Sequence, residues 1–129
     1  MLPVDSTARP KGLLLVVDDQ PFMAHYMRLV LEYGDGHDVA VAFNLEDAWA
    51  LFQREVSRVR AVLTDLLMPD GGGLELARRV HEAAPNMPVL LVTGHPLSEP
   101  LGPNCSLLEK PFGPDVLQAA VRQVIEASG

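Results

Sequence analysis

Short apolar runs alternate along this chain with longer segments whose apolar residues recur at helical spacing, and this alternation limits the fold more than any other feature. The first run, LLLVV at 13–17, ends at Asp18. A run that is apolar at every position is typical of a strand buried on both faces, as in a parallel sheet. The other expected strands lie at 38–43, 61–64, 88–92 and 105–108. The expected helices lie at 22–33, 45–56, 76–84 and 117–125.

This order of strands and helices favours βαβ units, in which right-handed crossovers place helices on both faces of a parallel sheet. Asn44, followed by Asp47, resembles a helix N-cap with its capping-box partner. The segment 94–104 (GHPLSEPLGPN) breaks the alternation, because its three prolines and two glycines leave room for about one helical turn at most. The helix between the fourth and fifth strands is therefore expected to be short or missing.

The composition fits one globular domain. The chain has 129 residues, of which 48% are apolar and 21% are charged, and this balance allows a buried core. Residues 1–11 contain prolines and show no apolar periodicity. We therefore expect a flexible tail at 1–11, one domain over 12–127, and no output domain within the chain.

The charge balance excludes some classes of partner. Ten Lys and Arg stand against 17 Asp and Glu, a formal net charge of −7. Binding to nucleic-acid backbones or to anionic membranes depends on clustered Lys and Arg, so neither is expected as a direct partner. No apolar run approaches the roughly 18 residues of a membrane-spanning helix. The single cysteine, Cys105, cannot form an internal disulfide, and the cytoplasm is the expected location.

Polar side chains follow four of the five expected strands. Asp18 and Asp19 follow the first strand, Asp65 the third, Thr93 the fourth and Lys110 the fifth. The carboxyl ends of strands meet at one edge of an open parallel sheet, where function gathers, so we expect these side chains to converge. Each of them alone is commonly a solvated carboxylate, a capping hydroxyl or a surface lysine. Their joint occurrence at one edge favours a functional site.

Carboxylates that converge need a positive partner, because at about 4 Å two like charges repel by roughly 1 kcal/mol in water and about 4 kcal/mol at intermediate dielectric. Mg²⁺ is the natural candidate, since it binds carboxylate and carbonyl oxygens and commonly joins protein carboxylates to phosphates. Lys110 supplies a second positive charge. An Asp beside both cations can act as a nucleophile and form an aspartyl phosphate.

Four short motifs of the sequence resemble those of a known family. They are VDD at 17–19, DLLMP at 65–69 with Gly73 after it, VTG at 92–94, and KPF at 110–112. In this order and spacing they resemble the response-regulator receiver domain of two-component signalling, over residues 12–127. The segments TDLLMP, LELARRV, PVLLVTGH and LLEKPF look most like the receivers of hybrid histidine kinases.

The resemblance implies a flavodoxin-like (βα)5 three-layer sandwich with the parallel strand order 2-1-3-4-5. It also implies that Asp65 is the phosphoacceptor and that Mg²⁺ is the cofactor. Asp19 would bind the metal directly, Asp18 would act mostly through water, and Leu67 would offer its backbone carbonyl.

The remaining motif residues receive roles from the same resemblance. Thr93 corresponds to the switch hydroxyl, Lys110 to the lysine that pairs with the phosphate, and Pro111 to a residue that follows a cis peptide bond. The expected partner is a histidine kinase or a histidine phosphotransfer protein. The domain would accept a phosphoryl group and slowly lose it, without being a turnover enzyme. Because the helix between the fourth and fifth strands is expected to be short or missing, the domain is expected to be mainly monomeric.

One departure from the family pattern concerns switching. Receivers usually carry Tyr or Phe three residues before the lysine, where this chain has Leu107. An alternative is therefore a receiver-fold interaction module that phosphorylation does not regulate. A phosphatase of the haloacid dehalogenase type would need a second Asp at the position of Leu67. A flavodoxin-like FMN site is disfavoured, because the diacid after the first strand would repel phosphate.

Overall fold

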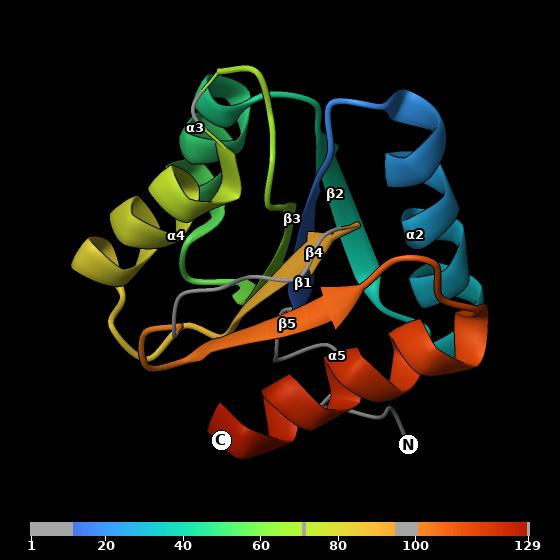
Figure 1. Ribbon diagram of the computed structural model, residues 1–129. Coiled ribbons are helices and arrows are strands. Elements are labelled where there is room, and N and C mark those ends of the chain that lie inside the picture. The colour runs from blue at the N-terminus through green and yellow to red at the C-terminus, as the bar shows by residue number, and fades with distance from the viewer. Residues whose placement is uncertain (1–11, 71, 95–100, 129) are drawn as a thin grey trace.

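Five parallel strands form the centre of the molecule in the order β2-β1-β3-β4-β5, as Figure 1 shows. The computed structural model describes residues 12–70, 72–94 and 101–128. The strands are β1 (Leu13–Val17), β2 (Asp38–Ala42), β3 (Val59–Asp65), β4 (Val89–Thr93) and β5 (Cys105–Glu109). The strand order and the parallel pairing confirm the expected flavodoxin-like sheet.

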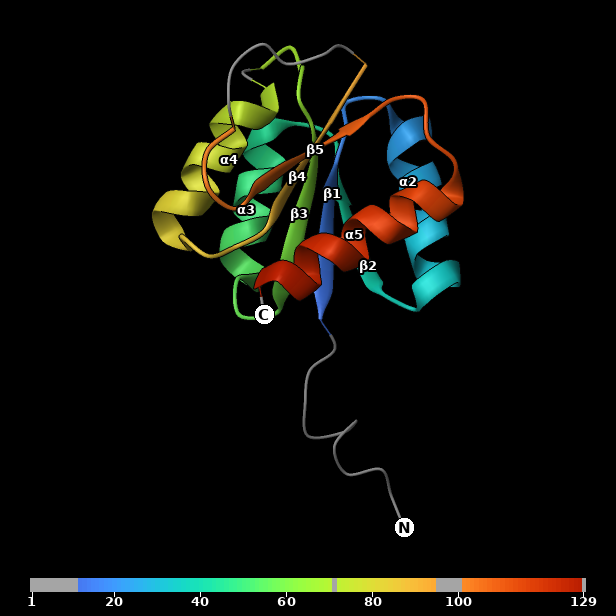
Figure 2. The ribbon, with the colours of Figure 1, turned by 60° about the horizontal axis from the view of Figure 1, so that its bottom comes forward.

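Helices cover both faces of the sheet, so the three-layer arrangement is also confirmed. Within the described part of the chain they are α2 (Pro21–Asp35), α3 (Leu45–Glu55), α4 (Gly72–Ala83) and α5 (Pro114–Ser128). The turned view in Figure 2 shows α2 and α5 on one face and α3 and α4 on the other. The fold therefore leaves the strand ends, rather than the sheet faces, open for a site.

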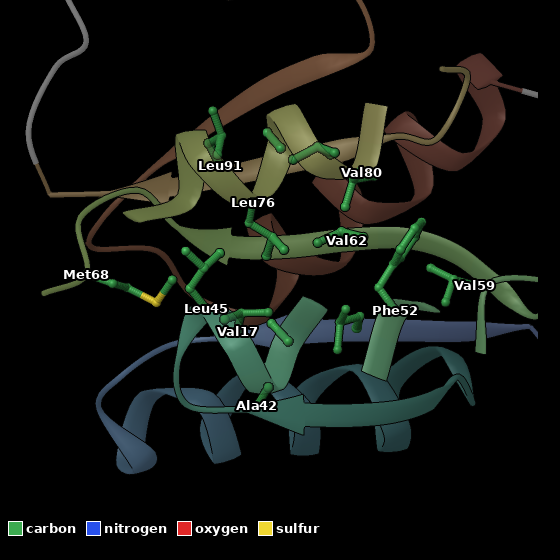
Figure 3. Packing of buried hydrophobic residues seen from close by; sticks show 14 of the residues in the cluster. Val17, Ala42, Leu45, Phe52, Val59, Val62, Met68, Leu76, Val80 and Leu91 are labelled. Carbon is green, nitrogen blue, oxygen red and sulfur yellow. The ribbon is translucent and has the colours of Figure 1, made fainter. Parts of the chain in front are cut away.

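The apolar run of β1 divides its side chains between the two cores. Leu13, Leu15 and Val17 belong to the cluster under α3 and α4, whereas Leu14 and Val16 belong to the cluster under α2 and α5. Successive side chains of a strand point to opposite faces, so a central strand with a helix layer on each side must be apolar at every position. Figure 3 shows the first cluster from close by.

The helix boundaries follow from local sequence signals. The side chain of Asn44 accepts the Asp47 N–H at 2.8 Å, so the predicted N-cap of α3 is confirmed. α2 begins at Pro21, and its C-cap is Gly36, whose φ of 72° is a left-handed conformation that glycine adopts without strain. On α3, the partly buried Trp49 stacks on Phe52 with 5.8 Å between ring centroids.

Some expectations fall wholly or partly on segments that the structure leaves undescribed. The tail at 1–11 lies outside the described residues, and so do residues 95–100 of the segment between β4 and β5. Residues 101–104, which are described, contain no helix. Within the described ranges, no helix has the length and apolar character needed to cross a membrane.

Candidate functional site

Three carboxylates and one ammonium group meet at the carboxyl edge of the sheet. Asp18 and Asp19 follow β1 and Asp65 ends β3, and one oxygen from each lies within 4.8 Å of the others. The Lys110 Nζ lies 3.7 Å from Oδ2 of Asp18 and 3.8 Å from Oδ1 of Asp65. The structure therefore brings these four sequence-predicted side chains together.

Thr93 lies at the same edge, at the end of β4. Its side chain is buried, and its carbonyl accepts the Lys110 N–H at 2.7 Å. The preceding residue, Val92, pairs in register with Asp65 on the neighbouring strand. Thr93 therefore lies on the strand that neighbours Asp65. Its role as a switch concerns the phosphorylated protein and stays a prediction.

The loop after Asp65, residues 66–70, is called here the β3–α4 loop. Leu66 and Met68 are buried, while the side chain of Leu67 between them is 62% exposed. The backbone N–H of Leu67 lies near the Asp65 carboxylate and acts to lower the pKa of that group. The backbone of Leu67 thus faces the site while its side chain faces solvent, and the role of its carbonyl as a metal ligand stays a prediction.

Two glycines close this loop onto β3. Gly72 has a φ of 79°, and a Cβ at Gly73 would lie 2.3 Å from the backbone oxygen of Asp65. The Gly73 N–H also donates to the carbonyl of Leu66 at 2.9 Å. A side chain at position 73 would push the loop away from Asp65, so the glycine of the motif has a steric reason.

Burial makes the carboxylates electrostatically costly. The Asp18 side chain is fully buried, and its Oδ1 accepts the Gln20 N–H at 2.9 Å. Burial raises the pKa of Asp18, although that hydrogen bond and Lys110 oppose the rise. The pKa of Asp65 is also raised, first by burial and then by the charge of Asp18, with Lys110 again opposing. A single ammonium group therefore does not neutralise the cluster.

A divalent cation fits this arrangement. Within the described part of the chain, Oδ2 of Asp18 is buried and receives no hydrogen bond. A buried carboxylate oxygen without a donor is costly unless a cation balances it, and the nearby Lys110 ammonium group is shared with Asp65. The donor set of carboxylate oxygens matches the hard ligands that Mg²⁺ prefers. Asp18, Asp19 and Asp65 are thus suited to hold such an ion.

Two features of the neighbouring segments bear on the sequence motifs. The peptide bond between Lys110 and Pro111 is cis, as the resemblance implied. Leu107, at the position where receivers usually carry Tyr or Phe, is half-buried and packs against the cluster under α3 and α4.

One residue of the site region was missed by the sequence reasoning. Asp70, in the β3–α4 loop, accepts the backbone N–H of Leu45 at 2.6 Å. The sequence shows only an Asp between a proline and glycines, which indicates a turn. Which N–H group such a carboxylate reaches depends on tertiary structure, so no local pattern could have found this contact.

The comparison with protein families decides what kind of domain this is. The family model for the response regulator receiver domain matches residues 14–122. The chain belongs to this family. Receiver domains are phosphoacceptors that bind Mg²⁺ in an acidic Asp cluster, interact with histidine kinases or phosphotransfer proteins, and are generally not turnover enzymes. The resemblance that the four motifs carried is therefore confirmed.

Similar proteins include response regulators from several bacteria. The C4-dicarboxylate transport transcriptional regulatory protein DctD of Pseudomonas aeruginosa is 35% identical over 119 residues, which cover 88% of this chain and 25% of DctD. Response regulator Rre1 of Synechocystis sp. is 30% identical over 125 residues, which cover 92% of this chain and 53% of Rre1. The receiver domain described here thus spans from a quarter to about half the length of these two relatives.

Solved structures agree on the fold of the receiver domain. A response regulator receiver protein from Sinorhizobium medicae is 26% identical, with a TM-score of 0.81 over 92% of this chain and 98% of that one. The receiver domain of the hybrid histidine kinase CckA has a TM-score of 0.78 at 21% identity, covering 88% of this chain and 99% of that one. The fold of the receiver domain is therefore shared across different kinds of signalling protein.

Proposed function

We propose that Asp65 accepts a phosphoryl group from the phosphohistidine of a histidine kinase or phosphotransfer protein in the cytoplasm, and that this changes the binding of protein partners. The observation that carries the proposal is the convergence of Asp18, Asp19, Asp65 and Lys110 at one edge of the sheet. Of these, Asp65 lies at the centre of the edge, on β3 between β1 and β4. It therefore has carboxylates on one side and Thr93 on the other.

Asp65 acts as the nucleophile in this proposal. One of its carboxylate oxygens forms a bond to phosphorus while the P–N bond of the phosphohistidine breaks, and the electron pair of that bond returns to the imidazole, which takes up a proton. Asp18, Asp19, Asp65 and the carbonyl of Leu67 would hold a Mg²⁺ ion, which would supply positive charge to the transferring phosphoryl oxygens. The Leu67 N–H orients the attacking carboxylate.

Lys110 and Thr93 are proposed to stabilise the phosphorylated state. Lys110 already lies 3.8 Å from the Asp65 carboxylate, so its ammonium group is within reach of an added phosphoryl oxygen. The Thr93 hydroxyl, buried at the end of the adjacent strand, is the group proposed to donate to a second oxygen. Charge-assisted hydrogen bonds of this kind are stronger than neutral ones.

The outward face of α2 is the proposed docking surface for the phosphodonor. Phe22 and Tyr33 are each 85% exposed and Leu29 lies between them on the same face, directly opposite the buried Met27 and Leu31. Such an apolar outer face is typical of a helix that contacts a partner. α2 begins directly after the Asp18–Asp19 pair, so a partner on this face reaches the site.

Phosphorylation by a small-molecule donor tests the proposal. Acetyl phosphate with Mg²⁺ should add one phosphoryl group, detected by intact-protein mass spectrometry, because the site supplies the nucleophile and both positive charges. The matched control is Asp65→Asn, whose amide cannot act as the nucleophile. Modification that persists in Asp65→Asn, or none in the wild-type protein, would contradict the assignment.

One observation favours a second candidate function. Leu107 has no hydroxyl or ring to follow Thr93, and its half-buried side chain already packs against a core cluster. A receiver-fold interaction module without phosphorylation-dependent switching is therefore the alternative. The two candidates differ in whether phosphorylation of Asp65 changes the affinity for a protein partner.

A further inference from the structure

The carboxylate of Asp70 joins two segments that are 25 residues apart in sequence. Its Oδ2 lies 2.6 Å from the backbone nitrogen of Leu45, the first residue of α3. The first N–H groups of a helix find no acceptor within the helix. Asn44 satisfies one of them, the N–H of Asp47, from the adjacent position. The start of α3 is thus capped twice, once locally and once from the β3–α4 loop.

The same loop is fixed at its other end beside Asp65. The Gly73 N–H donates a hydrogen bond to the carbonyl of Leu66 at 2.9 Å, and the Leu67 N–H lies near the Asp65 carboxylate. Between these contacts and Asp70, Met68 inserts its side chain into the cluster that also contains Leu45, and Figure 3 shows these two side chains at the same end of that cluster. The loop therefore bridges the carboxylate site and the first turn of α3.

The contact at Asp70 is stronger than an ordinary surface hydrogen bond. The acceptor is ionised, and hydrogen bonds to charged groups contribute more than neutral ones. A negative charge is also favourable at the N-terminus of a helix. Asp70 itself is exposed, so its own side chain has no core packing that would hold it in place if this bond were lost, whereas Met68 anchors the loop two residues earlier.

We propose that Asp70 is a positioning residue: by holding the β3–α4 loop on α3, it keeps the Leu67 N–H directed at Asp65 and couples the state of Asp65 to the first turn of α3. The coupling to phosphorylation rests on the proposed function of Asp65. Coupling between two sites is reciprocal, so a change of the loop at Asp65 alters the cap at Leu45, and loss of that cap alters the loop.

Amide hydrogen exchange in the unphosphorylated protein tests the structural half of the proposal. In Asp70→Ala, exchange should accelerate by about tenfold or more at Leu45, as expected for the loss of one hydrogen bond to a charged group, and it should also accelerate at Leu67. The matched control is Asn44→Ala, which removes the local cap of the same helix and should accelerate exchange at Asp47 while leaving Leu67 unchanged. Unchanged exchange at Leu67 in Asp70→Ala would overturn the proposal.

The rate of phosphorylation by acetyl phosphate tests the functional half. Asp70→Ala should lower the rate of phosphorylation by about threefold to tenfold, because the loop then holds the Leu67 N–H beside Asp65 for a smaller fraction of the time. Asp70→Asn keeps an oxygen acceptor and should restore most of the rate, and Asn44→Ala should leave it unchanged. If Asn44→Ala and Asp70→Ala slowed phosphorylation equally, Asp70 would act only as a cap of α3, and the proposed coupling would be refuted. If the wild-type protein accepts no phosphoryl group, the proposed function fails, and the exchange at Leu67 still decides whether Asp70 holds the loop.

Discussion

Replacement of Asp65 by Asn should make the metal-free domain more stable, although it removes the proposed phosphoacceptor. Asp65 repels the charges of Asp18 and Asp19 within 4.8 Å and attracts Lys110 at 3.8 Å. At an effective dielectric of about 20, Coulomb's law gives about 3.5 kcal/mol for each repulsion and about 4.4 kcal/mol for the attraction. The repulsions therefore exceed the attraction, and burial adds to the cost of the charge.

The net stabilisation expected for Asp65→Asn is about 1–2 kcal/mol, which lies between the energies calculated for bulk water and for an effective dielectric of about 20. For a domain of this size, it corresponds to a rise of about 3–6 °C in the midpoint of thermal unfolding. Differential scanning calorimetry without divalent metal measures it. The matched control is Glu126→Gln, which makes the same change in net charge at an exposed position on α5 and should shift stability by less than about 0.5 kcal/mol.

The pH dependence has a definite sign. The folded-state pKa of Asp65 is raised above its ordinary value of 3.8, so the folded protein binds the proton more tightly than the unfolded chain. The free energy of unfolding of the metal-free protein should therefore fall as pH rises from about 4 through the raised pKa, and Asp65→Asn should lose this part of the dependence.

Mg²⁺ should stabilise the wild-type protein and have little effect on the variant. A variant no more stable than Glu126→Gln without metal would refute the electrostatic reasoning.

Three further predictions address other parts of the domain. Gly73→Ala should destabilise the fold by about 2 kcal/mol or more in urea unfolding, because its Cβ would lie 2.3 Å from a backbone oxygen; wild-type stability would contradict the steric argument. Phe22→Ala with Tyr33→Ala should slow phosphotransfer from a protein donor but leave phosphorylation by acetyl phosphate unchanged, and equal slowing with both donors would argue against a docking surface. The domain should stay mainly monomeric in analytical ultracentrifugation with and without beryllofluoride, because Leu107 gains little by moving inward; a tight dimer that forms only with beryllofluoride would contradict this expectation.

The sheet could be predicted from the sequence because its signals are local. The run of β1 is apolar at every position, and that pattern arises only where both faces of a strand are covered. The expected convergence of Asp18, Asp65 and Lys110 needed only the rule that parallel strands end at one edge, and the structure confirms that these side chains meet there.

Other features could not be predicted because they depend on contacts between distant segments. Asp70 bonds to Leu45 only because the β3–α4 loop returns over α3. β3 begins at Val59, two residues before the apolar run that predicted it, because pairing with β1 extends the strand through a register shift. Phe22, Leu29 and Tyr33 form an apolar outer face of α2 opposite its buried face. The helical spacing predicted the buried face, but it does not show whether a partner covers the outer one.

The position of Trp49 gives the domain a built-in optical reporter. It is the single tryptophan of the chain, and it stacks on Phe52 in the second turn of α3, the helix that Asp70 caps. Its indole is partly buried against the core, so its emission wavelength and quenching depend on how α3 packs. Events at the carboxyl edge that reach this helix can therefore be followed in real time by fluorescence, in unlabelled wild-type protein.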